Sequence, residues 1–101
     1  MYLIQMLLPL RDNEDVAFPG RLYEEVRVNL AEHFGGVTTY MRAPATGIWE
    51  DNGDLVRDEV VIFEVMTDRL EREYWRLYRI ELQEAFRQDV IVIRSLRIDV
   101  L

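Results

Sequence analysis

The spacing of apolar residues switches between two periods along this chain, and the switching limits what the chain can fold into. The first stretch, Tyr2–Leu10, is almost wholly apolar until Pro9 and the polar run 11–15 interrupt it, as expected of a β-strand. After Pro19, apolar residues recur every four positions, which predicts a helix. These are Leu22, Val26 and Leu30. Gly35 or Gly36 then supplies a left-handed C-cap.

The middle of the chain has the pattern of a β-hairpin. Residues 37–42 and 58–66 are rich in β-forming residues, and Asn52-Gly53 lies between them. An Asn-Gly pair flanked by apolar residues is the strongest short signal for a two-residue hairpin loop. We therefore expect two antiparallel strands in this region, joined at Asn52-Gly53.

A second helical period follows the hairpin. Thr67 or Asp68 is expected to cap this helix, and Asp68 and Glu71 have the spacing of a capping box. One broad side of the helix is predicted to pack in the core and is rich in aromatic residues: Leu70, Tyr74, Trp75, Tyr78, Leu82, Ala85 and Phe86. The last stretch, residues 90–101, is β-branched and predicts a closing strand.

The resulting order is β-α-β-β-α-β in one domain spanning residues 1–101, which predicts an α+β, ferredoxin-like fold. Two right-handed crossovers place four antiparallel strands in the order 4-1-3-2, with both helices on one face. Alternation assigns side chains to the helix-covered face: Ile4, Met6, Leu8, Val37, Thr39, Met41, Val61, Phe63, Val65, Ile91, Ile93 and Ser95.

The opposite face of this sheet is predicted to be too apolar for water. Leu3, Leu7, Ile62, Val92 and Leu96 would form one patch, larger than monomers usually expose. A second copy of the chain is the simplest partner to cover this apolar face, because two-fold homodimers are the commonest assembly. We therefore expect a homodimer that pairs the two uncovered faces.

A polar row crosses this face and is the main candidate for ligand binding. It comprises Gln5, Tyr40, Arg42, Glu64 and Arg94. With the first strand central, Gln5 neighbours both Glu64 and Arg94, and Tyr40 or Arg42 lies beyond Glu64. Glu64 is either a general base or the partner of Arg94 or Arg42 in an ion pair.

The hairpin register decides where Tyr40 and Arg42 lie. A strict two-residue loop at Asn52-Gly53 sets Met41 opposite Glu64, and this swaps the two faces of the second strand. A bulge between Pro44 and Gly47 would restore Tyr40 and Arg42 to the uncovered face.

Other candidate residues have simple structural interpretations. His33 is expected at the C-terminus of the first helix, where the helix dipole favours a cation, and catalysis by His33 is the alternative. Trp49 is expected to pack across the hairpin, nearly opposite Val56, with ligand stacking as the alternative. Ser95 is expected on the core face, and no histidine lies near it in the sequence, which argues against a serine triad.

Composition excludes several kinds of chemistry. The chain has no cysteine, and all twelve basic residues are arginine, which excludes thiolate zinc sites, cysteine nucleophiles and Schiff-base lysines. A net charge of -7 without a basic cluster argues against nucleic acid. No metal or cofactor is expected, because the lone histidine lacks a ligand spacing. No apolar run is long enough for a membrane span, and the start of the chain lacks the features of a signal peptide, so we expect a cytoplasmic protein.

The chain resembles the small ferredoxin-like, dimeric α+β barrel proteins of bacteria, in element order and in the stretch "FGGVTTYMRAPATGIW". The first interpretation, which rests on the apolar uncovered face, is a homodimeric domain of unassigned function, with the interface and room for a small organic ligand on that face. A second interpretation is a cofactor-independent monooxygenase or isomerase, with Glu64 or His33 as base, Tyr40 as donor and Arg42 or Arg94 holding a carboxylate. A third is a protein-interaction module anchored by Trp49 on the hairpin arm.

Overall fold

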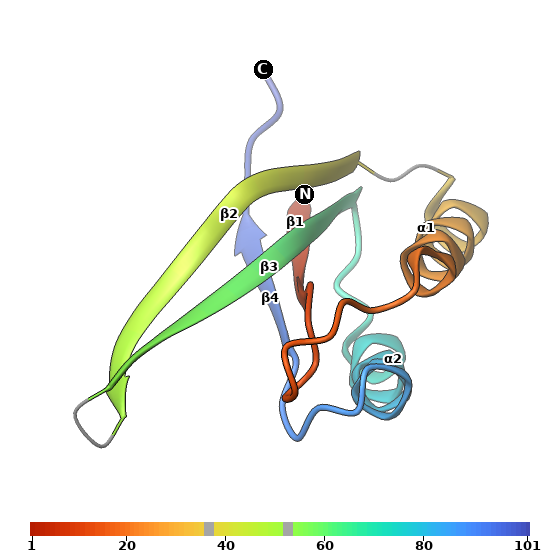
Figure 1. Ribbon diagram of the computed structural model, residues 1–101. Helices are drawn as coiled ribbons and strands as arrows, with labels where there is room; N and C mark the ends of the chain where they lie inside the picture. Colours follow the sequence, from red (N-terminus) through yellow and green to blue (C-terminus); the bar gives the residue numbers. More distant parts are fainter. Residues whose placement is uncertain (36–37, 52–53) are drawn as a thin grey trace.

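Six elements form the fold, in the predicted order (Figure 1). The computed structural model describes the backbone of residues 1–35, 38–51 and 54–101, and the side chains of residues 1–35 and 60–101. The elements are β1 (Tyr2–Pro9), α1 (Gly20–Phe34), β2 (Thr38–Asp51), β3 (Asp54–Thr67), α2 (Arg72–Ala85) and β4 (Val92–Arg97).

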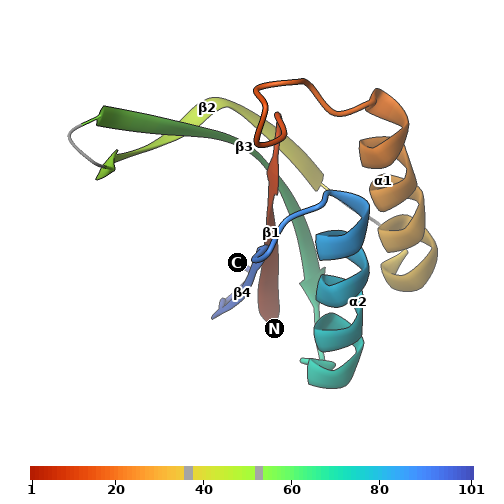
Figure 2. The same cartoon turned by 60° about the horizontal axis from the view of Figure 1, so that its bottom comes forward.

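All strand pairs are antiparallel, and the sheet order is β2-β3-β1-β4, or 4-1-3-2 when read from the β4 edge. Strand β1 is the centre of the pairing, since it bonds β3 along one edge and β4 along the other. Both helices lie on the same side of the sheet, and the opposite side carries no helix (Figure 2).

The prediction of a four-stranded sheet is wrong in how far the four strands run together. Within the described residues, four strands run side by side only at Gln5, Met6 and Leu7 of β1, where β2 contributes Thr38–Tyr40. At Tyr2–Ile4 the described part of the sheet has three strands, β3-β1-β4. Beyond Pro9, β2 and β3 continue as a two-stranded arm that leaves the rest of the sheet (Figure 2). The cause is strand length, because β2 and β3 have 14 residues each and β1 has 8.

A bulge interrupts β2, as was required to place Tyr40 on the uncovered face of the sheet. It lies closer to Tyr40 than the predicted position between Pro44 and Gly47. Asp51 pairs with Asp54, as a two-residue loop demands, and this register holds as far as Ala45 and Val60. The register then shifts, and Tyr40 pairs with Ile62, so five steps along β2 match two along β3. The three extra residues are an odd number, which reverses the faces of a strand. The loop residues Asn52-Gly53 lie outside the described residues.

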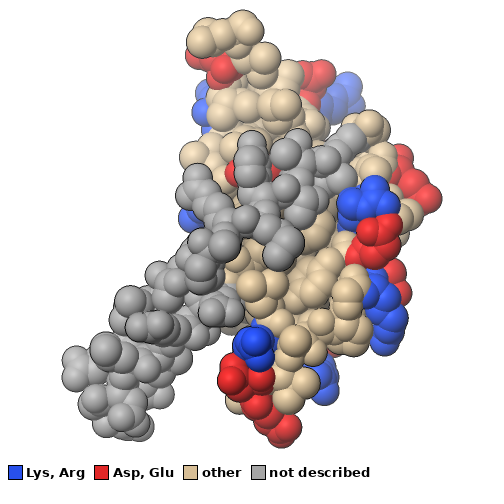
Figure 3. Space-filling view, turned by 45° about the horizontal axis from the view of Figure 1, so that its top comes forward, with Lys and Arg blue, Asp and Glu red and all other residues tan. Residues whose placement is uncertain are grey.

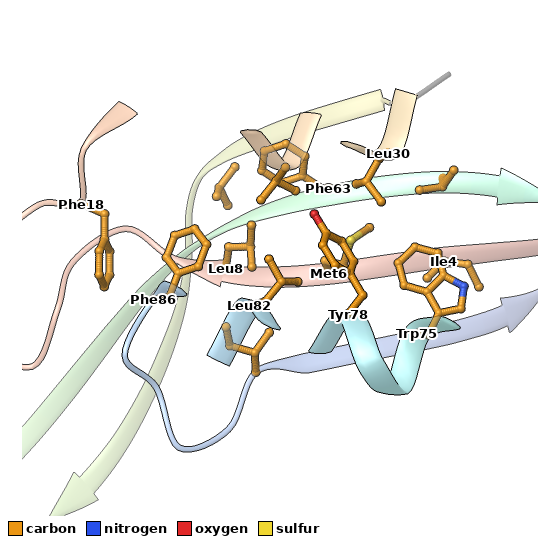
Figure 4. Close-up of a cluster of buried hydrophobic side chains, with 14 residues drawn as sticks. Ile4, Met6, Leu8, Phe18, Leu30, Phe63, Trp75, Tyr78, Leu82 and Phe86 are labelled. Atoms are coloured by element: carbon orange, nitrogen blue, oxygen red, sulfur yellow. The ribbon is translucent and has the colours of Figure 1, made fainter. Parts of the chain in front are cut away.

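The core lies between the sheet and the two helices (Figure 4). From β1, the alternate residues Ile4, Met6 and Leu8 are fully buried, as predicted. The helices contribute Val26, Leu30, Trp75, Tyr78 and Leu82, and Phe86 closes one end against Phe18 at a ring-centroid distance of 5.1 Å. Burying each large apolar side chain contributes about 1.5–3 kcal/mol, so this cluster supplies most of the stabilisation.

Two residues predicted on the core face of the last strand are less buried than expected. Ile93 is half-buried and Ser95 is exposed, although Ser95 pairs with the fully buried Ile4. The reason is a hollow between α2 and β4 that is lined by Ile93 and Ser95. Helix α2 therefore does not close over this edge of the sheet.

The two helices begin and end differently from each other. The C-cap of α1 is Gly35, with φ of 75°, and its N–H donates to the Ala31 carbonyl at 2.8 Å, which confirms the predicted glycine cap. Gly36 lies outside the described residues.

The predicted capping box of α2 is wrong, because Glu71 occupies the N-cap position and makes no side-chain capping bond. The Thr67 hydroxyl instead donates to the Arg69 carbonyl at 3.1 Å, in the turn before the helix.

The glycine cap gives a test with an internal control. Gly35→Ala places a Cβ in a left-handed conformation and is expected to lower the free energy of unfolding by about 1–2 kcal/mol, although nothing lies within 4 Å of that Cβ. Gly20→Ala meets equally open space at an ordinary φ, and is expected to leave stability unchanged or raise it by up to about 1 kcal/mol. Urea unfolding of both variants measures the difference; equal effects would show that backbone strain is not the cause.

The buried Tyr78 gives a test in alkali. Burial raises the pKa of Tyr78 from 10.0 to about 12, because its hydroxyl lies away from water and has no hydrogen-bond partner in the described structure. The unfolded chain therefore ionises before the folded one, and stability present below pH 10 is lost as the pH rises towards 12. Urea midpoints at pH 8 and pH 11 should differ less for Tyr78→Phe than for the unchanged protein. An identical loss in both would rule out Tyr78 as a source of the alkaline sensitivity.

Candidate functional site

Three polar side chains meet in a row across the uncovered face of the sheet. Gln5 Nε2 donates to Glu64 Oε1 at 2.7 Å, and Arg94 Nε donates to Gln5 Oε1 at 2.7 Å. The strand register sets Gln5 directly between the other two, as predicted. The structure therefore brings together three of the five predicted ligand-binding residues.

The predicted ion pair between Glu64 and Arg94 is replaced by a relay. The amide of Gln5 donates through its nitrogen to the carboxylate and accepts through its oxygen from the guanidinium. Each charge is thus satisfied by a charge-assisted hydrogen bond, which is stronger than a bond between neutral groups. The remaining donors of Arg94 lie on an exposed side chain.

Apolar side chains flank this polar row on both sides. One neighbouring row contains Leu96, Leu3 and Met66, and the other contains Val92, Leu7 and Ile62. Met66, Val92 and Leu96 are 57%, 48% and 46% exposed, whereas Ile62, which was predicted to be part of the exposed patch, is only 7% exposed. We refer to these three rows of three residues as the open face.

The remaining members of the predicted row are placed only in part. Tyr40 pairs with Ile62, whereas Thr38 pairs with Glu64, so Thr38 holds the position expected of Tyr40 or Arg42. Arg42 falls within the bulge and has no partner in the register. The side chains of Tyr40 and Arg42 lie outside the described residues, and their roles stay predictions. In the arm, Trp49 pairs with Val56, as predicted.

His33 belongs to a different part of the molecule. It lies on the last turn of α1, where its ring stacks on Tyr74 at 4.0 Å and its Nε2 is 3.1 Å from Glu71 Oε2. Tyr74 and Glu71 belong to the helical layer, whereas Glu64 lies on the open face. His33 and Glu64, the two bases predicted as alternatives, therefore lie in separate places and do not form one site.

A group of arginines was missed from the sequence. The hollow between α2 and β4 is lined by Arg72, Arg76, Arg79 and Arg94, which corrects the expectation that the chain has no basic cluster. The signal was present as three arginines spaced four and three residues apart, because such residues share one side of a helix. Elsewhere on the helical side, acidic and basic side chains interleave (Figure 3).

Neither a group of metal ligands nor a membrane-spanning helix occurs among the described residues. Within residues 1–35 and 60–101, whose side chains the structure describes, no three His, Asp or Glu side chains gather as a metal would need. In the same part of the chain, both helices fall short of the length and apolarity of a bilayer-spanning segment.

Comparisons with known proteins identify the fold. No protein-family model and no curated protein matches the chain. Among solved structures, the divalent cation tolerance protein CutA1 of Thermus thermophilus aligns with a TM-score of 0.60 at 16% identity, over 97% of this chain and 84% of that one. The PII-like protein CutA of Nostoc sp. PCC 7120 aligns with a TM-score of 0.55 at 14% identity, over 98% and 82%.

A phage SAM lyase in complex with S-methyl-5'-thioadenosine aligns with a TM-score of 0.59 at 13% identity, over 94% of this chain and 79% of that one. At these identities the likeness shows the fold alone: a small α+β domain of ferredoxin-like type, similar to CutA and PII-like proteins.

The relay through Gln5 is testable by a double-mutant cycle. Gln5→Leu leaves the half-buried Glu64 without its partner and is expected to cost about 1.5–3 kcal/mol of unfolding free energy. In a Glu64→Leu background the same change should cost much less, because both partners are then apolar. Urea unfolding of the four proteins gives the coupling energy; equal costs in both backgrounds would contradict the relay.

Proposed function

We propose that the chain is a self-associating domain, in which the open face of one copy pairs with the open face of a second copy. The observation that carries the proposal is the exposure of Met66, Val92 and Leu96 on a sheet face that no helix covers. Large apolar side chains exposed on an uncovered sheet face mark interaction sites in soluble proteins.

The pattern of the open face favours a second copy as the partner. The polar row carries a cation at one end, Arg94, and an anion at the other, Glu64, with Gln5 between them. Rotation by 180° about an axis that lies in the interface and runs along β1 at Gln5 sets Arg94 of one copy against Glu64 of the other. The same rotation lays each apolar row on the same row of the other copy, with its ends reversed. A face of this kind is self-complementary, as a two-fold interface requires.

A ligand role for the polar row rests on this assembly. Once the apolar rows are paired, the relay through Gln5 lies in a setting of low dielectric, where hydrogen bonds and charges interact more strongly than in water. Arg94 has guanidinium donors beyond the one used by Gln5, and guanidinium groups bind carboxylates in a fork geometry. A small organic carboxylate is the ligand class that this arrangement favours.

Light scattering at micromolar concentration tests the assembly. The unchanged protein is expected to have the mass of a dimer or larger oligomer, and Leu96→Asp is expected to be monomeric because a charge would be buried in the interface. Leu77→Asp is the matched control, since Leu77 is 51% exposed on α2, and this variant should remain associated. A monomeric mass for the unchanged protein would contradict the proposal.

A charge swap tests the two-fold pairing itself. Arg94→Glu and Glu64→Arg are each expected to weaken association at least tenfold, because like charges then face each other across the axis. The double variant restores opposite charges and should recover most of the affinity. If the double variant associates no better than the single ones, the face pairs in another way.

A further inference from the structure

The hollow between α2 and β4 concentrates positive charge in a chain whose net charge is negative. Its volume is about 230 Å³, and it is lined by Arg72, Arg76 and Arg79 of α2 and by Arg94 of β4. The chain as a whole carries a net charge of -7. Four of the twelve cations in the sequence therefore border one small space.

The arginines that line the hollow are only partly neutralised. Arg76 Nη2 lies 2.6 Å from Glu73 Oε1, and both side chains are more than half exposed. Arg94 uses Nε on Gln5, which is uncharged. Within the described residues, Arg72 and Arg79 form no ion pair or side-chain hydrogen bond. Like charges three or four residues apart on a helix repel each other. An anion bound beside Arg72 and Arg79 would therefore stabilise this row of arginines.

A buried donor on a residue that lines this hollow points independently to a ligand. Trp75 is 6% exposed, and its indole Nε1 is buried without a hydrogen-bond partner in the described structure. Trp75 lines the hollow, and its nitrogen lies on the side of the ring towards Ile4, which lines the hollow too (Figure 4). A buried N–H without an acceptor loses the hydrogen bond that water would give it, and native proteins rarely leave one unpaired.

We propose that this hollow binds a small oxyanion, a phosphate ester or a short carboxylate, between Arg72, Arg79 and the Trp75 N–H. Guanidinium groups present paired donors that match the oxygens of phosphate and carboxylate. The Ser95 hydroxyl, on the opposite wall, supplies one more donor. The volume is below the roughly 300–1,000 Å³ of pockets for drug-sized ligands, so the ligand is small. This site shares Arg94 with the open face, but none of its other lining residues belongs to that face.

The salt bridge between Glu73 and Arg76 predicts how affinity can be raised. The Glu73 carboxylate holds an arginine that could otherwise turn to the ligand. An exposed pair of this kind contributes little to stability, so an anion can displace it at small cost. Glu73→Gln removes the competing charge and is expected to raise affinity several-fold.

Tryptophan fluorescence in a Trp49→Phe background tests the proposal, because Trp75 is then the only indole. Titration with inorganic phosphate and, separately, with succinate at constant ionic strength is expected to change Trp75 emission saturably with at least one of them. A response to phosphate alone assigns a phosphate ligand, and a response to succinate alone assigns a carboxylate. No saturation with either anion up to about 10 mM, which is about tenfold above a Kd of about 1 mM, would overturn the proposal.

Paired variants separate a built site from general charge effects. Arg72→Gln with Arg79→Gln is expected to weaken binding at least tenfold, whereas Arg21→Gln with Arg27→Gln on α1 makes the same charge change away from the hollow and should leave binding intact. Circular dichroism confirms that each pair is folded. Equal loss in both pairs would overturn the proposal, because the anion would then be responding to net charge. Arg94 is left unchanged, so a failure here does not bear on self-association.

Discussion

The central position of β1 is the constraint on which the rest of the structure depends. Its backbone is bonded on both edges, and alternate side chains, Ile4, Met6 and Leu8, are fully buried under the helices. The intervening residues therefore have to point to the other face, which makes Gln5 the bridge between β3 and β4. Core and candidate site are thus the two sides of one eight-residue strand.

Features with a local cause could be predicted from the sequence. The alternation in β1 assigned Ile4 and Gln5 to opposite faces, and the central position of that strand placed Gln5 between Glu64 and Arg94. Gly35 was predictable for a similar reason, because only glycine adopts a left-handed cap without strain. In each case the residues concerned determine the outcome with little help from distant parts of the chain.

Features that depend on how elements pack were not predictable. The start of α2 is set by the turn at Thr67–Arg69, which overrides the capping-box spacing of Asp68 and Glu71. Ser95 has the alternation of a core residue but is exposed, because α2 leaves the β4 edge open. The arginine-lined hollow combines a helix stripe with a strand residue, Arg94, and only the packing of α2 beside β4 reveals it.

The bulge in β2 has a consequence for how this strand tolerates changes in length. Five residues of β2 span the distance of two residues of β3 between Tyr40 and Ala45. Adding or deleting two residues there would keep Thr38–Tyr40 on the same faces relative to the arm, whereas one residue would invert them. Among homologues, insertions in this segment should therefore come in even numbers, and an odd one should be accompanied by exchanged apolar and polar positions at its N-terminal end.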